Sequence, residues 1–135
     1  MKKVILLLLI CFVCVFVISC NEEPTKIDDV SLFEELFDGA IKYDIRTEKE
    51  CEDGHIPGFM CMGEKDRDTL IKNIDLVALN KEQKIILIGN EEDVLYILNK
   101  LSKKGYKYLY YFAGSYDGYA TKKGESFIPE TGCGC

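Results

Sequence analysis

The segment Ile85–Ile88 constrains the fold more than any other part of this sequence. It holds four consecutive apolar residues after a lysine. An apolar run without alternation is typical of a strand covered on both faces, as in a parallel sheet between two layers of helices. Residues 93–104 then show apolar side chains at helical intervals, up to Gly105. This part of the chain therefore predicts a buried strand followed by a helix.

Strand-like and helix-like segments alternate along the rest of the chain. Strands are predicted over residues 41–45, 59–62 and 106–112, with a short edge strand around 25–27, and helices over 31–38, 47–53 and 70–77. Capping-box patterns, Ser31 with Glu34 and Thr47 with Glu50, mark the first two helices. Alternating strands and helices favour right-handed crossovers. The predicted class is α/β, with a mainly parallel central sheet flanked by helices on both faces.

The first 20 residues have the layout of a secretory signal. Lys2 and Lys3 precede an unbroken apolar run over residues 4–18, and Ser19 and Cys20 end it. A run of this length fits a signal peptide better than a membrane-spanning helix. The sequence Val-Ile-Ser-Cys at its end resembles the lipobox of bacterial lipoproteins, in which the cysteine is acylated and the chain is cut before it.

This resemblance implies that residues 1–19 are removed and that Cys20 becomes a lipidated amino terminus. The two or three acyl chains of a lipoprotein give a stable tether, whereas one chain binds only marginally. Residues 20–29 would then be the lipidated end and a spacer. The alternative is an ordinary signal or anchor with an incidental cysteine. The expected location is the bacterial cell envelope, on the extracytoplasmic side of a membrane. The lipid on Cys20 would bind that membrane.

Charge and length bound the remaining chain. After removal of residues 1–19 the chain has 23 acidic residues and 15 lysines and arginines, because the leader contains Lys2 and Lys3 of the 17 and no acidic residue. An acidic chain of this kind lacks the basic surface that nucleic acid requires. The length suits one domain with a single core. We therefore expect one domain and no nucleic-acid partner.

One motif indicates what the domain is. Residues 44–58 read Asp-Ile-Arg-Thr-Glu-Lys-Glu-Cys-Glu-Asp-Gly-His-Ile-Pro-Gly. This segment resembles the rhodanese-like family, whose domains carry Asp-Val-Arg at a strand end, a glutamate four residues after the arginine, and Gly-His-Ile-Pro-Gly four residues later. The matching positions are Asp44, Arg46, Glu50, Gly54, His55, Ile56, Pro57 and Gly58. The resemblance runs on to residue 132, which predicts a domain over residues 30–132. We expect His55 to be structural, hydrogen-bonded to backbone groups.

The family resemblance also implies a catalytic loop, and here the sequence departs from it. In active members a nucleophilic cysteine follows the strand equivalent to Ile85–Ile88 and takes up sulfur as a persulfide. The matching residue is Gly89, and the loop continues with Asn90, Glu91, Glu92 and Asp93. Three carboxylates would repel anionic sulfur species and raise the pKa of a thiol. They also suit the first turn of a helix that Asn90 caps.

The other cysteines offer alternative thiols. We expect Cys51, which replaces an aromatic residue of the family, to be a buried inert thiol, while Cys61 could face either way. Residues 133–135 form a Cys-Gly-Cys tail, and Cys133 and Cys135 could exchange thiols or close an easily reduced disulfide. An ordinary flexible tail remains equally open. Without a second cluster of ligands we predict no metal and no cofactor.

Two main hypotheses follow. The first is a lipid-anchored rhodanese-like domain without its nucleophile, which acts as a non-catalytic binding or scaffolding module for a protein or a small sulfur species. The second is a sulfur carrier or thiol-redox protein that uses Cys133 and Cys135. Phosphate chemistry is a weaker third, since it requires a loop cysteine and an arginine that this loop lacks.

Overall fold

The structure is a computed structural model that describes residues 21–63 and 65–132. The predicted signal peptide, the lipidation site Cys20 and the tail cysteines Cys133 and Cys135 lie outside these residues. Within the two described ranges, no helix has the length and apolar character needed to cross a membrane.

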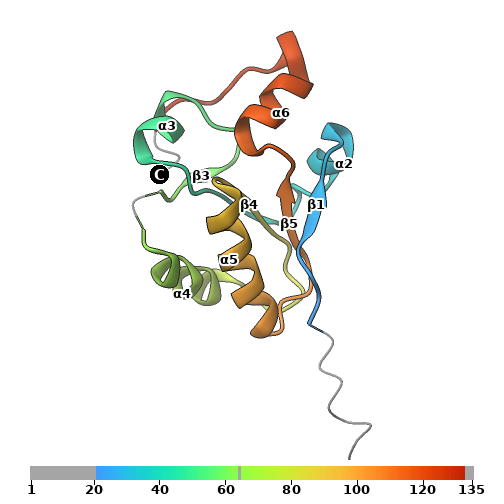
Figure 1. Cartoon of the computed structure of the whole chain (residues 1–135), viewed down its shortest axis with the longest axis vertical. Coiled ribbons are helices and arrows are strands. Elements are labelled where there is room, and N and C mark those ends of the chain that lie inside the picture. The colour runs from blue at the N-terminus through green and yellow to red at the C-terminus, as the bar shows by residue number, and fades with distance from the viewer. Residues whose placement is uncertain (1–20, 64, 133–135) are drawn as a thin grey trace, which may run out of the picture.

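The described residues form one five-stranded sheet in the order β1-β5-β4-β2-β3 (Figure 1). Its strands are β1 (Thr25–Ile27), β2 (Ile41–Asp44), β3 (Met60–Cys61), β4 (Ile85–Ile88) and β5 (Leu109–Phe112). Every strand pair is parallel. The predicted α/β class is confirmed, and the sheet is wholly rather than mainly parallel.

Helices cover both faces of this sheet (Figure 1). They are α2 (Val30–Glu35), α3 (Glu48–Asp53), α4 (Arg67–Val77), α5 (Glu91–Lys103) and α6 (Ser115–Lys123), followed by the 3₁₀ turn η2 (Gly124–Ser126). One apolar cluster joins α4 and α5 to the sheet, and a second joins α2 and α6 to its other face.

The central strand β4 supplies side chains to both clusters, as the sequence predicts. Ile85 and Leu87 pack with α4 and α5, while Ile86 and Ile88 pack in the cluster that contains α2 and α6. All four residues are buried. Alternate residues of a strand point to opposite faces, so a strand between two helical layers must be apolar throughout.

Polar caps fix where the helices begin. The predicted capping box at the start of α3 is confirmed, since Thr47 and Glu50 each bond the other's backbone N–H. The predicted box at Ser31 and Glu34 is wrong. Asp29 caps α2 instead, because its carboxylate accepts a hydrogen bond from the backbone N–H of Leu32 at 2.9 Å. Helix α2 therefore begins one residue earlier than the sequence pattern suggests.

The described part of the expected spacer, residues 21–29, contacts the domain at two places. The anticipated edge strand is β1, which pairs with β5. Upstream of it, the backbone oxygen of Glu22 accepts a hydrogen bond from Ser102 Oγ at 2.5 Å. The chain is therefore bound to the domain almost from the first described residue, at the amino end of β1.

Candidate functional site

The candidate site lies where the carboxyl ends of β2, β4 and β5 meet, at one edge of the sheet. In open parallel sheets this edge is where ligands bind. A cavity of about 480 Å³, called here the Arg46 cavity, is lined by Ile45, Arg46, Thr47, Glu50, Gly63, Gly89, Asn90, Asp93 and Ser115. The structure thus brings Arg46, from the end of β2, and the loop after β4 together at one cavity.

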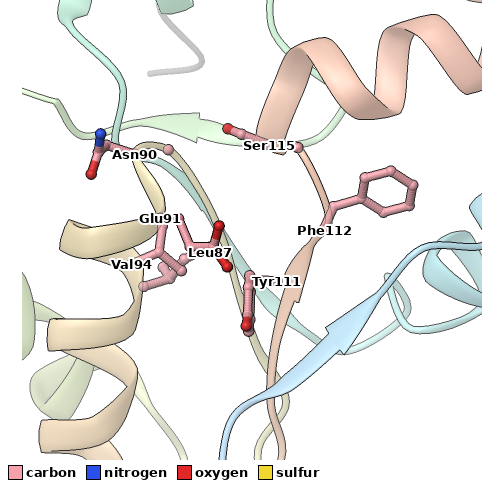
Figure 2. A pocket seen from close by; sticks show the side chains of 9 residues that line it. Leu87, Asn90, Glu91, Val94, Tyr111, Phe112 and Ser115 are labelled. Atoms are coloured by element: carbon pink, nitrogen blue, oxygen red, sulfur yellow. The ribbon is translucent and has the colours of Figure 1, made fainter.

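A second cavity, called here the Tyr111 cavity, lies between α5 and β5 and has a volume of about 230 Å³ (Figure 2). Its lining comprises Leu87, Gly89, Asn90, Glu91, Val94, Tyr111, Phe112, Gly114 and Ser115. Apolar walls with a few polar groups at one end are typical of sites for small molecules or side chains.

Gly89 directly follows β4, at the position where the family resemblance implies a nucleophile. It is buried, and a Cβ built on it would lie only 2.4 Å from Ile45 Cγ1. The backbone N–H of Ile45 donates a hydrogen bond to the oxygen of Ile88 at 2.7 Å, which holds the two backbone segments close together. Ile45 therefore fills the space that the Cβ atom of a nucleophilic side chain at position 89 would need.

The acidic loop is a self-capped helix start whose charges are paired. Asn90 caps α5, and the three acids occupy its first turn, as predicted. Lys26 Nζ lies 2.7 Å from Glu91, and Arg67 contacts both Glu92 and Asp93. The hydrogen bond with Glu91 raises the pKa of Lys26. These pairs weaken the expected repulsion of anions, because the charges of Lys26 and Arg67 partly neutralise those of the three acidic residues.

Asp44 and Arg46 form a buried ion pair at the end of β2. The Asp44 side chain is 1% exposed and that of Arg46 is 14% exposed, with Nη2 2.6 Å from the carboxylate. Arg46 Nε donates to the same carboxylate at 3.0 Å, and Nη2 also donates to the backbone oxygen of Gly54 at 2.7 Å. The guanidinium carbon lies 3.9 Å from the centre of the Tyr116 ring. Most of the bonding capacity of Arg46 therefore serves the fold rather than a ligand.

Ser115 is a site residue that the sequence analysis missed. It is the only non-glycine residue of the described ranges with a positive φ, at 58°. Its Oγ is buried and has no hydrogen-bond partner among the described residues, and it borders both cavities. Such a backbone conformation and a solitary buried hydroxyl each cost free energy. Its place just after β5, at the binding edge of a parallel sheet, is the signal that could have found it.

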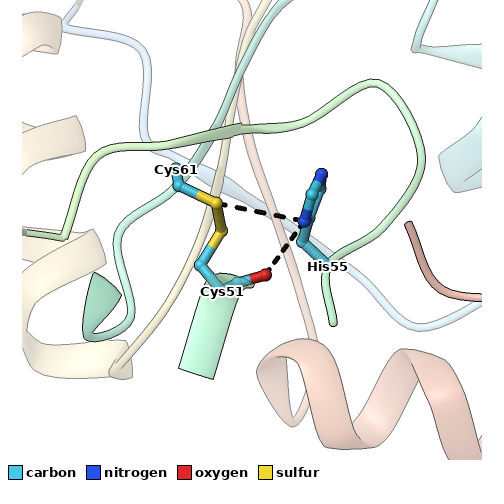
Figure 3. A group of neighbouring side chains, drawn as sticks. All are labelled: Cys51, His55 and Cys61. Carbon is cyan, nitrogen blue, oxygen red and sulfur yellow. Dashed lines mark hydrogen bonds between the residues drawn. A yellow bond between two sulfur atoms is a disulfide. The ribbon is translucent and has the colours of Figure 1, made fainter. Parts of the chain in front are cut away.

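Cys51 and Cys61 form a disulfide, which corrects two expectations (Figure 3). Cys51 is buried as predicted, but it is not a free thiol, and Cys61 is not a candidate nucleophile while the bond is closed. The bond joins α3 to β3, with the two Cα atoms 5.7 Å apart. The two residues are brought together because the chain reverses between them at the Gly-His-Ile-Pro-Gly segment.

His55 lies beside this disulfide and is fully buried. Its Nδ1 is 2.9 Å from the backbone oxygen of Cys51, and because a carbonyl only accepts, Nδ1 carries the proton. The same nitrogen lies 3.9 Å from Cys61 Sγ, and Nε2 lies 3.5 Å from a carboxylate oxygen of Glu130. Of the two backbone bonds that an imidazole could make here, the structure shows one, and Nε2 has no backbone partner among the described residues.

The cluster of Cys51, His55 and Cys61 also resembles a metal site in its spacing, since its potential ligand atoms lie within 4.8 Å of one another. Metals of the kind that sulfur binds require thiolates. In this structure the two sulfurs are bonded to each other and Nδ1 is protonated. The closed disulfide therefore does not fit a metal.

Comparisons with known proteins agree with this geometry. The family model described as "Rhodanese-like domain" matches residues 30–122. Among solved structures, the Alr3790 protein from Anabaena sp. is 19% identical with a TM-score of 0.61, covering 79% of this chain and 82% of that one. The BH2092 protein from Bacillus halodurans is 20% identical with a TM-score of 0.55, covering 82% and 77%. These likenesses show the fold. No curated protein shows significant similarity.

Replacement of Arg46 by methionine is expected to destabilise the domain by about 3–5 kcal/mol, because Asp44 would remain buried without its cation. The measurement is urea unfolding of residues 21–135 at neutral pH. Lys49→Met is the matched control, since the Lys49–Asp53 pair is 83% and 67% exposed and should contribute little. Equal stability of the two variants would show that the buried pair does not hold this edge together.

The contact between Gly89 and Ile45 can be tested with a double-mutant cycle. Gly89→Ala is expected to cost about 1–3 kcal/mol, because the new methyl group overpacks against Ile45. Ile45→Ala removes the obstructing atoms, so the double variant should be more stable than the sum of the single effects predicts. Unfolding free energies from urea titrations give the coupling. Strict additivity would mean that the two residues do not compete for this space.

Proposed function

Because the chain belongs to the rhodanese-like domain family, we propose that it is a membrane-tethered, extracytoplasmic member that does not transfer sulfur at the loop after β4. It acts instead as a binding or scaffolding module. The observation that carries this proposal is Gly89, which stands in the nucleophile's position and has its side-chain space filled by Ile45. Nucleophilic catalysis needs a nucleophile at that point.

The lining of the two cavities supports a non-catalytic role. Among the described residues that line them there is no cysteine, no histidine and no lysine. The Ser115 hydroxyl has no hydrogen-bond partner among the described residues, so no base activates it as a nucleophile. The Thr47 hydroxyl donates to the Glu50 carboxylate at 2.6 Å as part of the capping box that begins α3. Arg46 is engaged with Asp44 and Gly54. The residues that line the cavities thus offer polar and apolar groups for binding, but no thiol that could carry sulfur.

The Tyr111 cavity is the part of the site best suited to binding. Leu87 and Val94 supply apolar wall, and the amide of Asn90 and the hydroxyl of Ser115 supply polar groups at one end (Figure 2). The unpartnered Oγ of Ser115 would gain a hydrogen bond from a bound polar group. A volume of about 230 Å³ suits a small molecule, including a sulfur species, or one side chain of a partner protein.

The position of the amino terminus supports a site that faces away from the membrane. Glu22 is attached just before β1, and β1 runs parallel to every other strand. A lipid on Cys20 would therefore hold the amino-end edge of the sheet towards the bilayer. The cavities lie beyond the carboxyl ends of the strands, at the opposite edge of the sheet. A tethered module in this orientation presents its site to partners in the extracytoplasmic space.

A thiosulfate:cyanide sulfurtransferase assay on the detergent-solubilised full chain tests the catalytic part of the proposal. No turnover above the uncatalysed rate is expected, because the loop has no thiol to form a persulfide. A rhodanese-like domain with a loop cysteine serves as the positive control. Turnover that persists in a Cys133→Ser/Cys135→Ser variant would overturn the proposal, whereas turnover lost in that variant would favour the sulfur-carrier alternative.

Incorporation of labelled palmitate in a bacterial host tests the tether. The wild-type chain is expected to take up label and to sediment with membranes, and Cys20→Ser is expected to take up none, because it removes the acylated thiol. Cys11→Ser is the matched control, since it changes another cysteine of the leader and should behave as wild type. Equal labelling of the Cys20→Ser variant would contradict lipidation at this residue.

A further inference from the structure

The buried side chain of His55 has one nitrogen whose hydrogen bonding is incomplete. Nδ1 donates its proton to the backbone oxygen of Cys51, so Nε2 is the unprotonated nitrogen of the neutral ring. Nε2 has no hydrogen-bond partner among the described residues, and it faces a carboxylate oxygen of Glu130 at 3.5 Å. Two acceptors therefore face each other, and a buried acceptor without a donor costs free energy.

The other ring nitrogen lies beside two sulfur atoms (Figure 3). Nδ1 is 3.9 Å from Cys61 Sγ, and the ligand atoms of Cys51, His55 and Cys61 all lie within 4.8 Å of one another. In a tetrahedral zinc site, with Zn–S bonds of about 2.3 Å and Zn–N bonds of about 2.0 Å, a sulfur and a nitrogen ligand are about 3.5 Å apart. The nitrogen of His55 and the sulfur of Cys61 thus already lie near the spacing of a zinc site.

We propose that Cys51, His55 and Cys61 form a Zn²⁺ site when the disulfide between the two cysteines is reduced. The site is separate from the two cavities, and it does not rest on the proposed binding function. The sequence did not predict this cluster, because its members meet only where α3 is joined to β3. With the disulfide closed the sulfurs are not ligands, so the bond controls whether the site exists.

A dithiol reductant opens the bond in two exchange steps. The sulfurs of Cys51 and Cys61 take up two electrons and two protons, and the dithiol becomes a disulfide. Zn²⁺ then displaces the two thiol protons, which pass to solvent, and binds both thiolates. The proton of His55 moves from Nδ1 to Nε2 through solvent, and the freed lone pair of Nδ1 binds the metal.

This change of tautomer satisfies the two acceptors that face each other in the closed form. Nε2–H can donate to the carboxylate of Glu130, and metal-binding histidines are commonly held in this way by a carboxylate. Glu130 is itself fixed, because its carboxylate accepts from the backbone N–H of Gly58 at 2.9 Å. The backbone oxygen of Cys51 loses the Nδ1 donor but still accepts from the backbone N–H of Gly54 at 3.2 Å. Glu130 is therefore a positioning residue for His55.

Burial and ligand type favour Zn²⁺ over other cations. Cys51 and His55 are fully buried, and an uncompensated charge is costly there. Two thiolates neutralise a divalent cation, and the neutral imidazole adds no charge. Sulfur and nitrogen ligands do not suit Mg²⁺ or Ca²⁺, which bind oxygen. Cys61 is only partly buried, so water can reach the fourth position that three protein ligands leave.

Metal titration before and after reduction tests the site. The protein is the detergent-solubilised full chain with Cys133→Ser/Cys135→Ser, so that tail thiols do not bind metal. A phosphine, which ends as its oxide, reduces the disulfide without adding a thiol. The reduced chain is expected to bind one Zn²⁺ that the oxidised chain does not bind, and Co²⁺ in its place should show thiolate-to-metal charge-transfer absorption. Equal binding by the two forms overturns the proposal.

Replacements in the same background identify the ligands. Cys61→Ser measures Zn²⁺ bound elsewhere, including at the leader cysteines, and should lose the reduction-dependent site. His55→Gln is expected to weaken this binding at least tenfold, because it removes a ligand, and Glu130→Gln roughly tenfold, because it removes the carboxylate that holds the ring. Glu52→Gln is the matched control, since it changes an exposed acid of α3, and should bind as the parent does. Unchanged affinity in either the His55 or the Glu130 variant overturns the proposal.

The titration also decides the matter if the reduced chain does not fold by itself. Zn²⁺ is then expected to restore the circular dichroism spectrum of the oxidised chain, because the free energy of metal binding contributes to folding. A reduced chain that stays unfolded in Zn²⁺ contradicts the site. The sulfurtransferase assay reads the loop after β4, so the outcome there and the outcome at the zinc site are separable.

Discussion

The rest of this structure depends on the buried ion pair between Asp44 and Arg46. A buried carboxylate is tolerated only when a cation and hydrogen bonds compensate for its lost hydration, and Arg46 supplies both. The same guanidinium bonds the backbone at Gly54, where α3 ends, and stacks on Tyr116 of α6. One side chain therefore joins the end of β2 to two helices that are separate in sequence. The walls of the candidate site keep their positions because this pair holds them.

Around this frame, three features of the site carry the proposed binding role. Ile45 fills the space beside Gly89, the acids at the start of α5 are paired with Lys26 and Arg67, and Ser115 keeps a buried hydroxyl without a partner. A fold can keep its architecture while the chemistry at its site changes, because the site depends on a few residues and the fold on the whole core. The Cys51–Cys61 disulfide is a separate feature: it joins α3 to β3 beside His55, and neither cysteine lines the two cavities.

Local sequence was sufficient for much of the fold and part of the site. The apolar run Ile85–Ile88 predicted a central strand, because only a strand buried on both faces omits polar residues. The capping box of α3 and the N-cap at Asn90 were predictable, since each depends on residues within one helical turn. The edge strand of residues 25–27 was anticipated as well, whereas the cap of α2 was assigned to Ser31 in place of Asp29, because several polar residues near a helix start can fill that role.

The sequence by itself determined the α/β class, the Asp44–Gly58 motif of the family, and the glycine that follows the central strand. These features are local, fixed by residue type and spacing along the chain. Only the tertiary structure decided that Cys51 bonds Cys61, that Lys26 pairs with Glu91, that Ile45 closes the space at Gly89, and that Gly132 lies beside Cys61 Sγ. The physical reason is the same in each case. These contacts form between elements that meet only when the sheet and its helices pack, so no local sequence pattern predicts them.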